Sequence, residues 1–421
     1  MYHQINEDIQ TNSMDINWKK NTALFVTGQA LSLFGTMVVQ YAIMWHITLM
    51  TQSGTMMTLF TIAGLLPMFF ISPFGGVWAD RYNRKYIINI ADGSIAFASL
   101  IVAVLIMSGI DLVGILLACS IIRSFGQGVQ TPAVGAFIPQ IVPQEHLTRI
   151  NGLQSSIQSF IFLTSPMISA ALMSFVSLEI LFFLDVVTAA IGISIVSFFV
   201  KVPQREKPVP KTGEQKDITY WNDLREGIRY IKQHGYISRL MLLTAIFLFF
   251  FAPASFLTPL QVIRNFGNDV WRLSAIEVVF SAGMMLGGIL IGYWGGFKNR
   301  VSTMSLSCVL CGALTVWLGI APYFWLYLAI MATLGLTLPL WNTPFMVLLQ
   351  TTVETAFMGR VLSVFSMISA TMMPLGMIVF GPVADTVSIN ILLVGTGAII
   401  MLLAIPLIRN KTLREAGKMQ P

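Results

Sequence analysis

Apolar residues come in long runs along this chain, separated by short polar segments. Twelve runs reach the ~20 residues that a helix needs to cross a ~30 Å hydrocarbon core. They cover residues 22–50, 55–78, 86–107, 112–138, 148–174, 178–200, 236–260, 272–295, 301–320, 323–349, 360–384 and 387–409. The pattern predicts an all-α integral membrane protein with twelve transmembrane helices.

Composition agrees with this prediction and argues against a soluble enzyme. The 421 residues are 55% hydrophobic and only 10% charged, with a mean hydropathy of +0.75, whereas soluble domains carry roughly 25% charged residues. The three cysteines (Cys119, Cys308 and Cys311) all lie within predicted spans. Because their number is odd and they lie within the spans, we expect neither a disulfide framework nor a metal site.

The basic residues predict an orientation. If the N-terminus is cytoplasmic, 22 of the 25 Lys and Arg residues fall on the cytoplasmic side, Arg264 and Arg272 fall outside, and Arg123 lies within the membrane. This bias follows the positive-inside rule and places both termini in the cytoplasm. The net charge of +6 therefore reflects topology, and no nucleic-acid partner is implied. The segment 1–21 is polar and lacks the apolar core of a signal peptide.

One segment, residues 201–235, interrupts the apolar rhythm. It begins as a charged linker and then places Trp221, Leu224, Ile228 and Ile231 at helical spacing, the pattern of a helix that lies in the membrane interface. We therefore expect five regions in the chain. They are a cytoplasmic tail (1–21), a six-helix bundle (22–200), a cytoplasmic linker with an amphipathic helix (201–235), a second six-helix bundle (236–409) and a cytoplasmic tail (410–421).

Two landmarks of the first bundle recur in the second. Thr131-Pro132 in span four corresponds to Thr343-Pro344 in span ten. The loop starting at Gly76 resembles the loop starting at Gly292. The two offsets along the chain are nearly equal, which favours a duplicated six-helix unit, with two chance matches as the alternative. Two pseudo-symmetric six-helix halves joined by a cytoplasmic linker are typical of major facilitator transporters.

The first copy of this loop reads Gly76-x-Trp78-Ala79-Asp80-Arg81-x-Asn83-Arg84-Lys85 and resembles the loop signature of the major facilitator superfamily. The resemblance implies a conformational role for Gly76, Asp80, Arg81, Arg84 and Lys85. Gly75 and Gly76 would let span two approach a neighbouring helix closely, and Asn83 would tolerate left-handed geometry. Asp80 could pair with Arg84 one helical turn on, or each could cap or hold another helix end. The alternative is a simple positively charged anchor.

Further stretches are similar to the macrolide-efflux (Mef-type) branch of the superfamily. They are Arg123-Ser124-x-Gly126, Thr131-Pro132-Ala133, Pro139-Gln140-Ile141-Val142-Pro143, Gly283-Met284-x-Leu286-Gly287-Gly288, Gly359-Arg360-Val361-x-Ser363, Pro374-x-Gly376 and Gly381-Pro382-x-Ala384-Asp385. In span five, Ser165-Pro166-Met167-Ile168-Ser169-Ala170 departs from the Gly-Pro-x-x-Gly-Gly stretch of drug antiporters. The expected export direction therefore depends on the overall likeness.

Four charged residues lie more than one helical turn inside a predicted span: Asp92, Arg123, Asp185 and Glu277. A charge at the bilayer centre costs at least ~2.5–3.5 kcal/mol, so such residues are candidates for proton coupling. A carboxyl group removed from water favours its protonated form. Asp185 is the first candidate because its own span offers no cation, and Arg123 is the one cation that could pair with it. The alternatives are a permanent ion pair for Arg123, inner-gate pairing for Asp92 and snorkelling for Glu277.

Polar and aromatic residues also occur together at membrane depth. Gln40, Tyr41 and Trp45 in span one, with Trp341 and Asn342 in span ten, suit an apolar substrate cavity with a few polar contacts. Interfacial aromatic belts would explain the same residues equally well.

These features predict a secondary transporter that exports hydrophobic or amphipathic small molecules, such as macrolide-like antibiotics, across the bacterial cytoplasmic membrane by proton antiport. We expect a monomer in the lipid bilayer, driven by the proton gradient and needing no cofactor or metal. No P-loop is present, so ATP is not the expected energy source. The alternatives are export of an endogenous amphiphile (a siderophore, peptide or lipid) and a transport-dead membrane sensor or scaffold.

Overall fold

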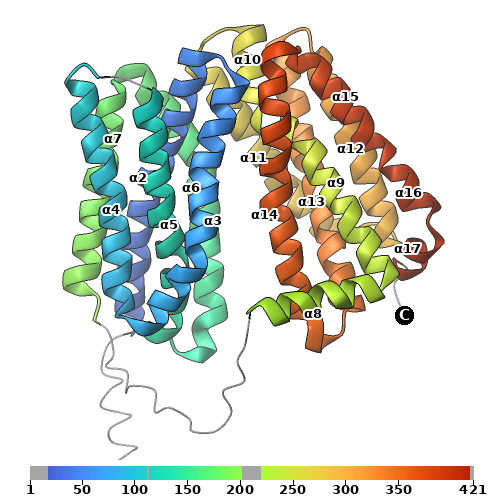
Figure 1. The fold of residues 1–421 in the computed structure, drawn as a ribbon, viewed down its shortest axis with the longest axis horizontal. Helices are drawn as coiled ribbons and strands as arrows, with labels where there is room; N and C mark the ends of the chain where they lie inside the picture. Colours follow the sequence, from blue (N-terminus) through green and yellow to red (C-terminus); the bar gives the residue numbers. More distant parts are fainter. Residues whose placement is uncertain (1–17, 111–112, 202–219, 418–421) are drawn as a thin grey trace, which may run out of the picture. The chain divides into compact units, whose positions relative to one another are not determined.

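The computed structural model describes residues 18–110, 113–201 and 220–417, and these ranges contain helices and connecting segments but no β-strand (Figure 1). Within them, twelve helices are long and apolar enough to cross a membrane. The predicted all-α architecture with twelve membrane-spanning helices is confirmed. The predicted division into separate helices at residues 301–320 and 323–349 is also confirmed, because one helix ends at Ile320 and the next begins at Phe324.

The helix bounds in the first half are α2 (Trp18–Thr51), α3 (Gly54–Arg81), α4 (Arg84–Met107), α5 (Val113–Ile141), η1 (Gln144–His146), α6 (Leu147–Phe175), α7 (Leu178–Ser194) and the π-turn η2 (Ile195–Phe199). In the second half they are α8 (Tyr220–Gln233), α9 (Gly235–Phe256), α10 (Thr258–Phe266), α11 (Val270–Trp294), α12 (Arg300–Ile320), α13 (Phe324–Thr352), α14 (Thr355–Thr386), α15 (Ile389–Leu402), α16 (Ala404–Arg409) and α17 (Lys411–Ala416).

The chain packs as two compact units. Among the described residues, unit 1 comprises 18–46 and 59–201, and unit 2 comprises Ile47–Thr58 and 220–417. The boundary thus falls inside α2 and α3, so the turn that joins these helices packs with the second half of the chain. The prediction assigned residues 22–200 to one N-terminal bundle and did not set this turn apart.

Two predicted spans contain a helix break that hydropathy alone did not show. Helix α9 ends at Phe256 and α10 starts at Thr258, with Pro259 in the first turn of α10. Helix α15 ends at Leu402 before α16, which contains Pro406. Proline lacks an N–H and its ring clashes with the carbonyl one turn earlier, but it fits the first turn of a new helix.

The duplication is visible at one residue in each half. Asn83 precedes α4 and its side-chain oxygen accepts the backbone N–H of Lys85 at 3.1 Å. Asn299 occupies the matching place in the second half, where it precedes α12 and accepts the N–H of Val301 at 3.0 Å. Both therefore act as helix N-caps. The expected left-handed geometry of Asn83 is wrong, because its φ of −67° and ψ of 112° are extended and an N-cap requires that conformation.

Helix α8 packs partly on protein. Tyr230 is buried and stacks on Phe357 with 4.5 Å between ring centroids, and Glu226 pairs with Arg360 at 2.9 Å. In Figure 1, α8 runs across the ends of α9 and α14. The apolar face predicted for the membrane interface thus contacts protein in part, because Ile231 is buried whereas Ile228 is exposed. The side chains of Trp221 and Leu224 lie outside the described residues.

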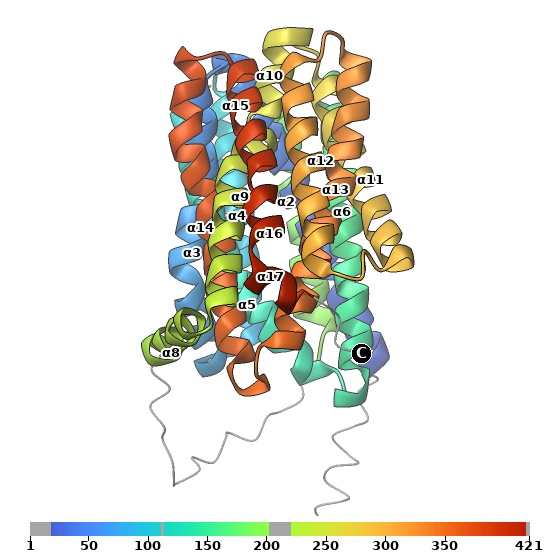
Figure 2. The same cartoon turned by 90° about the vertical axis from the view of Figure 1, so that its right-hand side faces the viewer.

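The chain end folds back onto unit 2. Helices α15, α16 and α17 follow one another along one side of this unit (Figure 2). The N–H of Arg300 donates to the carbonyl of Gly417 at 3.0 Å, and the amide of Asn299 donates to the carbonyl of Arg414 at 2.8 Å. Part of the predicted tail 410–421 is therefore helical and bonded to the start of α12.

Candidate functional site

Unit 1 contains a cavity of about 560 Å³ between α2, α3, α5 and α6. Its polar lining consists of uncharged amides and hydroxyls, namely Gln29, Gln127, Gln130, Thr131, Asn151, Gln154, Ser155 and Gln158. Its apolar lining includes Phe25, Leu33, Met37, Met68 and Phe162. Apolar walls with a few polar groups are typical of small-molecule sites, and methionine adapts to varied ligand shapes.

The sequence analysis missed this cavity. A signal was present, because Gln127 and Gln130 are three apart in one apolar span and Gln154 and Gln158 are four apart in the next. Such spacing places each pair on one helix face. Amides carry no charge, so the sequence analysis, which looked for charged residues within the spans, did not select them.

Asp92 of α4 lies directly behind the cavity wall. The side chain is 3% exposed, and its two oxygens accept amide hydrogens from Gln29 at 3.1 Å and from Gln130 at 3.2 Å. Gln130 also donates to the amide oxygen of Gln29 at 2.8 Å. No cation contacts Asp92 among the residues that the structure describes. The carboxyl group is therefore linked to the cavity through two of its lining amides.

Arg123 and Asp185 meet in the interior of unit 1. The Arg123 guanidinium donates to the Asp185 carboxylate and to the hydroxyl of Ser99, and both charged side chains are at most 1% exposed. Ser99 also donates to Asp185 at 2.6 Å, and Thr36 does so at 3.2 Å. The arrangement joins α2, α4, α5 and α7.

This geometry bears on the expectations for both residues. The predicted meeting of the two helices occurs, so α5 supplies the cation that the span of Asp185 lacks. Burying both charges together within a set of hydrogen bonds is also what the alternative of a permanent ion pair requires.

Glu277 is the one candidate of the four that belongs to the other unit. It belongs to α11 in unit 2, whereas Asp92, Arg123 and Asp185 belong to unit 1. Its side chain is partly exposed. It forms no hydrogen bond or ion pair with the residues described.

The two basic residues after Asn83 bind helix ends. Lys85 donates to the carbonyls of Ser197 and Val200, both at 2.8 Å. Arg84 donates to the carbonyls of Ala79 at 2.9 Å and Ala136 at 2.8 Å. Cations stabilise the carbonyl ends of helices. These contacts all lie within unit 1.

The other residues of this loop differ. Arg81 is exposed and has no partner among the described residues. The side chain of Asp80, and with it the expected Asp80–Arg84 pair, lies outside them. Gly75 makes the expected close approach, because a Cβ there would lie 2.8 Å from the carbonyl oxygen of Gly128. A Cβ at Gly76 would meet nothing within 4 Å, so the packing role expected for Gly76 is wrong.

The predicted cavity residues of spans one and ten are not among those that line the cavity of unit 1. Trp45 is 0% and Trp341 2% exposed, and Trp341 stacks on Phe247 with 4.6 Å between centroids. Their large rings fill space between helices. Gln40 and Tyr41 are half-buried on α2, and Asn342 is exposed on α13.

Within the part of the chain that the structure describes, twelve apolar helices of membrane-spanning length and a cavity lined by amides and apolar side chains are features of a multi-pass membrane transporter. The chain belongs to the Major Facilitator Superfamily, whose profile matches residues 23–377.

Sequence relatives extend this likeness over most of the chain. Macrolide efflux protein A of Streptococcus pyogenes is 30% identical over 391 residues, which cover 92% of this chain and 95% of that protein. Macrolide efflux protein A of Enterococcus faecalis is 29% identical over 328 residues, which cover 77% of this chain and 100% of that protein. The resemblance to the macrolide-efflux branch is confirmed.

Solved structures confirm the fold. A bacterial homologue of the iron transporter ferroportin has a TM-score of 0.69 at 13% identity, covering 93% of this chain and 99% of that one. A D-xylose–proton symporter has a TM-score of 0.66 at 14% identity, covering 95% of this chain and 99% of that one.

Proposed function

We propose that this protein exports hydrophobic or amphipathic small molecules, macrolide-like antibiotics among them, across the bacterial cytoplasmic membrane. The observation that carries the proposal is the cavity of unit 1, whose lining combines apolar side chains with uncharged amides and hydroxyls. Such a lining suits a bulky apolar ligand that carries several oxygen functions. The likeness to macrolide efflux proteins supports the same substrate class.

The energy source we propose is the proton gradient, used by antiport. Two halves would rock about a substrate site and expose it to each side in turn. Asp92, Arg123, Asp185 and Glu277 are the candidates for proton coupling, and Asp92 gains weight because it adjoins the cavity without a cation partner among the described residues. The basic residues of the loop at 76–85 would hold helix ends during this motion. We propose a monomer with both termini cytoplasmic.

A second candidate within the transport class is export of an endogenous amphiphile such as a siderophore, peptide or lipid. The neutral lining of the cavity accommodates this chemistry as well. Drug susceptibility of cells with and without the protein, across chemically distinct antibiotics, separates the two. A rise in resistance confined to macrolides supports the first candidate, and unchanged susceptibility to every compound contradicts it.

Collapsing the proton gradient is expected to abolish export, whereas depleting ATP at a constant gradient is not. The reason is that no nucleotide-binding loop is present in the sequence. Efflux of a radiolabelled macrolide from preloaded cells measures both arms. Export that follows ATP and ignores the gradient would contradict secondary transport.

A further inference from the structure

Gln29 and Gln130 belong both to the cavity lining and to the hydrogen bonds of Asp92. An amide has a donor end and an acceptor end. In the structure the NH₂ groups of both residues point at Asp92, and the oxygen of Gln29 accepts from Gln130. The oxygen of Gln130 has no partner among the described residues. With Asp92 ionised, the amide pair thus leaves an acceptor for the cavity.

Protonation of Asp92 would reverse this pattern. A protonated carboxyl group is itself a donor, and the groups that can accept from it are the Ser32 hydroxyl and the two amides, of which an amide must first turn its oxygen toward Asp92. Its NH₂ group then points away from Asp92. The membrane-embedded charges on the helices packed against α4 are Asp185 and Arg123, which already bind each other. Of the partners of Asp92, which are Ser32 and the two amides, Gln29 and Gln130 are the ones that carry both a donor end and an acceptor end at the cavity.

We propose that Gln29 and Gln130 are positioning residues that transmit the protonation state of Asp92 to substrate in the cavity. The substrate class is an amphiphile with hydroxyl or ammonium donors. It binds while Asp92 is ionised and is released when Asp92 takes a proton, which is the order that antiport requires. This inference rests on the proposed export function and adds the residues through which proton and substrate communicate.

The test compares Gln130→Leu with Gln127→Leu. Both glutamines are half-buried on α5 and line the cavity, but only Gln130 bonds Asp92. Binding of a radiolabelled macrolide to the purified full-length protein is measured at several pH values. The unsubstituted protein is expected to bind about tenfold more weakly at acidic pH, within the ~5–150-fold range of coupled sites. Gln130→Leu and Asp92→Asn are expected to lose this pH dependence, and Gln127→Leu to keep it.

Two results would overturn the inference: pH-independent binding by the unsubstituted protein, or full pH dependence in Gln130→Leu. If the unsubstituted protein binds no macrolide at any pH, the proposed substrate class is wrong. The inference about Gln29 and Gln130 is then tested by a measurement that needs no ligand. The pH-difference infrared spectrum is expected to show a carboxylic-acid band that Asp92→Asn lacks, together with side-chain amide bands. Loss of those amide bands in Gln130→Leu but not Gln127→Leu supports the inference, and their persistence in Gln130→Leu contradicts it.

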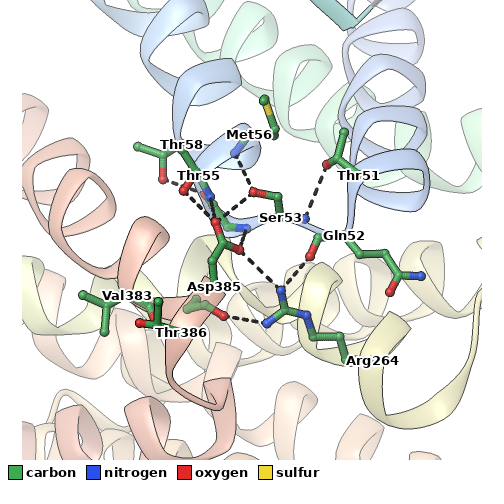
Figure 3. Close-up of polar contacts among 12 residues, drawn as sticks. Thr51, Gln52, Ser53, Thr55, Met56, Thr58, Arg264, Val383, Asp385 and Thr386 are labelled. Atoms are coloured by element: carbon green, nitrogen blue, oxygen red, sulfur yellow. Dashed lines mark hydrogen bonds and ion pairs between the residues drawn. The ribbon is translucent and has the colours of Figure 1, made fainter.

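A second inference comes from unit 2, where a carboxylate from one helix caps the start of another. Asp385 of α14 accepts the backbone N–H groups of Gly54 at 2.6 Å and Thr55 at 3.0 Å, and the hydroxyls of Ser53 at 2.8 Å and Thr55 at 2.6 Å (Figure 3). The first N–H groups of a helix lack partners within it and attract negative charge. A residue near the other end of the chain thus supplies the cap of α3.

Arg264 of α10 forms hydrogen bonds with the same turn between α2 and α3 and with α14. Its guanidinium donates to the carbonyls of Gln52 and Ala384, both at 2.6 Å, and lies 3.4 Å from Asp385 (Figure 3). Gln52 has a φ of 44°, a conformation that costs a non-glycine residue on the order of 1 kcal/mol or more. The bond from Arg264 offsets that cost while the contact is formed.

The backbones of α3 and α14 touch beside these bonds. A Cβ added to Gly381 would lie 2.8 Å from the carbonyl oxygen of Gly54, and the Thr58 hydroxyl donates to the carbonyl of Met377 at 3.1 Å. We call the polar part of this contact, formed by residues 52–55 with Arg264 and Asp385, the clasp.

The clasp holds a turn whose two helices, α2 and α3, both continue into unit 1. The predicted orientation places this turn on the external side. Unlike the buried Arg123–Asp185 pair, Arg264 and Asp385 are 30% and 28% exposed, so water can replace their bonds when they separate. Charge-assisted bonds are strong while formed, but partly exposed pairs contribute little net stability. These properties suit a contact that forms and breaks repeatedly.

We infer that the clasp is the external gate of the transporter: its bonds are formed in this structure and break for release of substrate. The inference uses the alternating access of the proposed function. Its test is accessibility, which needs no substrate.

A single cysteine at Thr58, which is 4% exposed, is labelled in cells with a membrane-impermeant maleimide after Cys119, Cys308 and Cys311 are replaced by serine. Asp385→Asn and Arg264→Gln are each expected to raise the labelling rate about tenfold, a typical size for a shifted conformational equilibrium. Thr386→Val is the matched control, because the Thr386 hydroxyl bonds only Val383 of its own helix. Unchanged labelling in Asp385→Asn would overturn the inference.

A crosslink tests the same gate in the closed direction. The side chains of Ser53 and Asp385 are in contact, so the pair Ser53→Cys and Asp385→Cys can form a disulfide under oxidation. Oxidation is expected to block labelling at residue 58, and a reductant to restore the fast labelling that loss of the Asp385 carboxylate gives. Undiminished labelling in the crosslinked protein would contradict a gate at this position, even if the macrolide proves to be the wrong substrate.

Discussion

Arg123→Leu is expected to destabilise the protein severely, because it leaves Asp185 as an unpaired charge in the interior of unit 1. Removing one partner of a buried ion pair costs about 3–5 kcal/mol. The side chains of Arg123 and Asp185 are at most 1% exposed, so water cannot take the place of the guanidinium. Thermal unfolding of the purified protein measures the loss. Arg149→Leu, at an exposed position of α6, is the control and is expected to change little.

The pattern of partial rescue distinguishes charge from geometry. Arg123→Lys keeps the charge but loses the planar fork that reaches Asp185, Ser99 and the carbonyl of Thr36 together, so it is expected to restore stability only partly. The double variant Arg123→Gln with Asp185→Asn removes both charges and is expected to be more stable than either single variant. Equal stability of Arg123→Leu and the unsubstituted protein would contradict this interpretation of the pair.

Transport by the double variant decides whether the pair also carries the proton. Purified protein in liposomes with an imposed pH gradient is assayed for uphill accumulation of a macrolide. If Asp185 is the proton carrier, the double variant is expected to lose uphill transport but keep downhill exchange. If uphill transport survives, the pair is structural, and Asp92 becomes the first candidate.

The fold was predictable because one force dominates it. Apolar runs long enough to span lipid identify the helices without any knowledge of how they pack. The breaks before α10 and α16 were missed because hydropathy does not record a missing N–H. The prolines there were visible, but others such as Pro132 and Pro344 stay within continuous helices.

The candidate site was less predictable because it depends on which face of each helix points where. The sequence singled out the intramembrane charges by their cost, and the structure places three of the four in unit 1. It named Arg123 as the one cation that could pair with Asp185, but it could not show whether the two helices bring them together. Trp45 and Trp341 are buried, and the sequence does not distinguish an aromatic residue that fills packing space from one that lines a cavity. The clasp joins segments near opposite ends of the chain, a contact that no local pattern reveals.

Gly75→Leu is expected to prevent α3 and α5 from packing, whereas Gly76→Leu, at the next position, is expected to leave the fold intact. A Cβ at position 75 would lie 2.8 Å from the carbonyl oxygen of Gly128 and 2.9 Å from the Cα of Val129. These are backbone atoms that no rotamer change can move aside. Overpacking costs about 1–3 kcal/mol even where side chains can adjust, so we expect a larger loss here.

Position 76 offers the matched control, because an added Cβ there meets nothing within 4 Å. Gly76→Ala is expected to be neutral or to stabilise α3 by about 0.5–1 kcal/mol, since glycine is the poorer helix former. Thermal unfolding and the amount of folded protein in the membrane measure both positions, and equal losses at 75 and 76 would contradict the packing argument. The folded Gly76→Leu variant then tests the loop itself. Reduced efflux would support the conformational role that the resemblance implies for Gly76, whereas normal efflux would assign the close approach, and the need for glycine, to Gly75 alone.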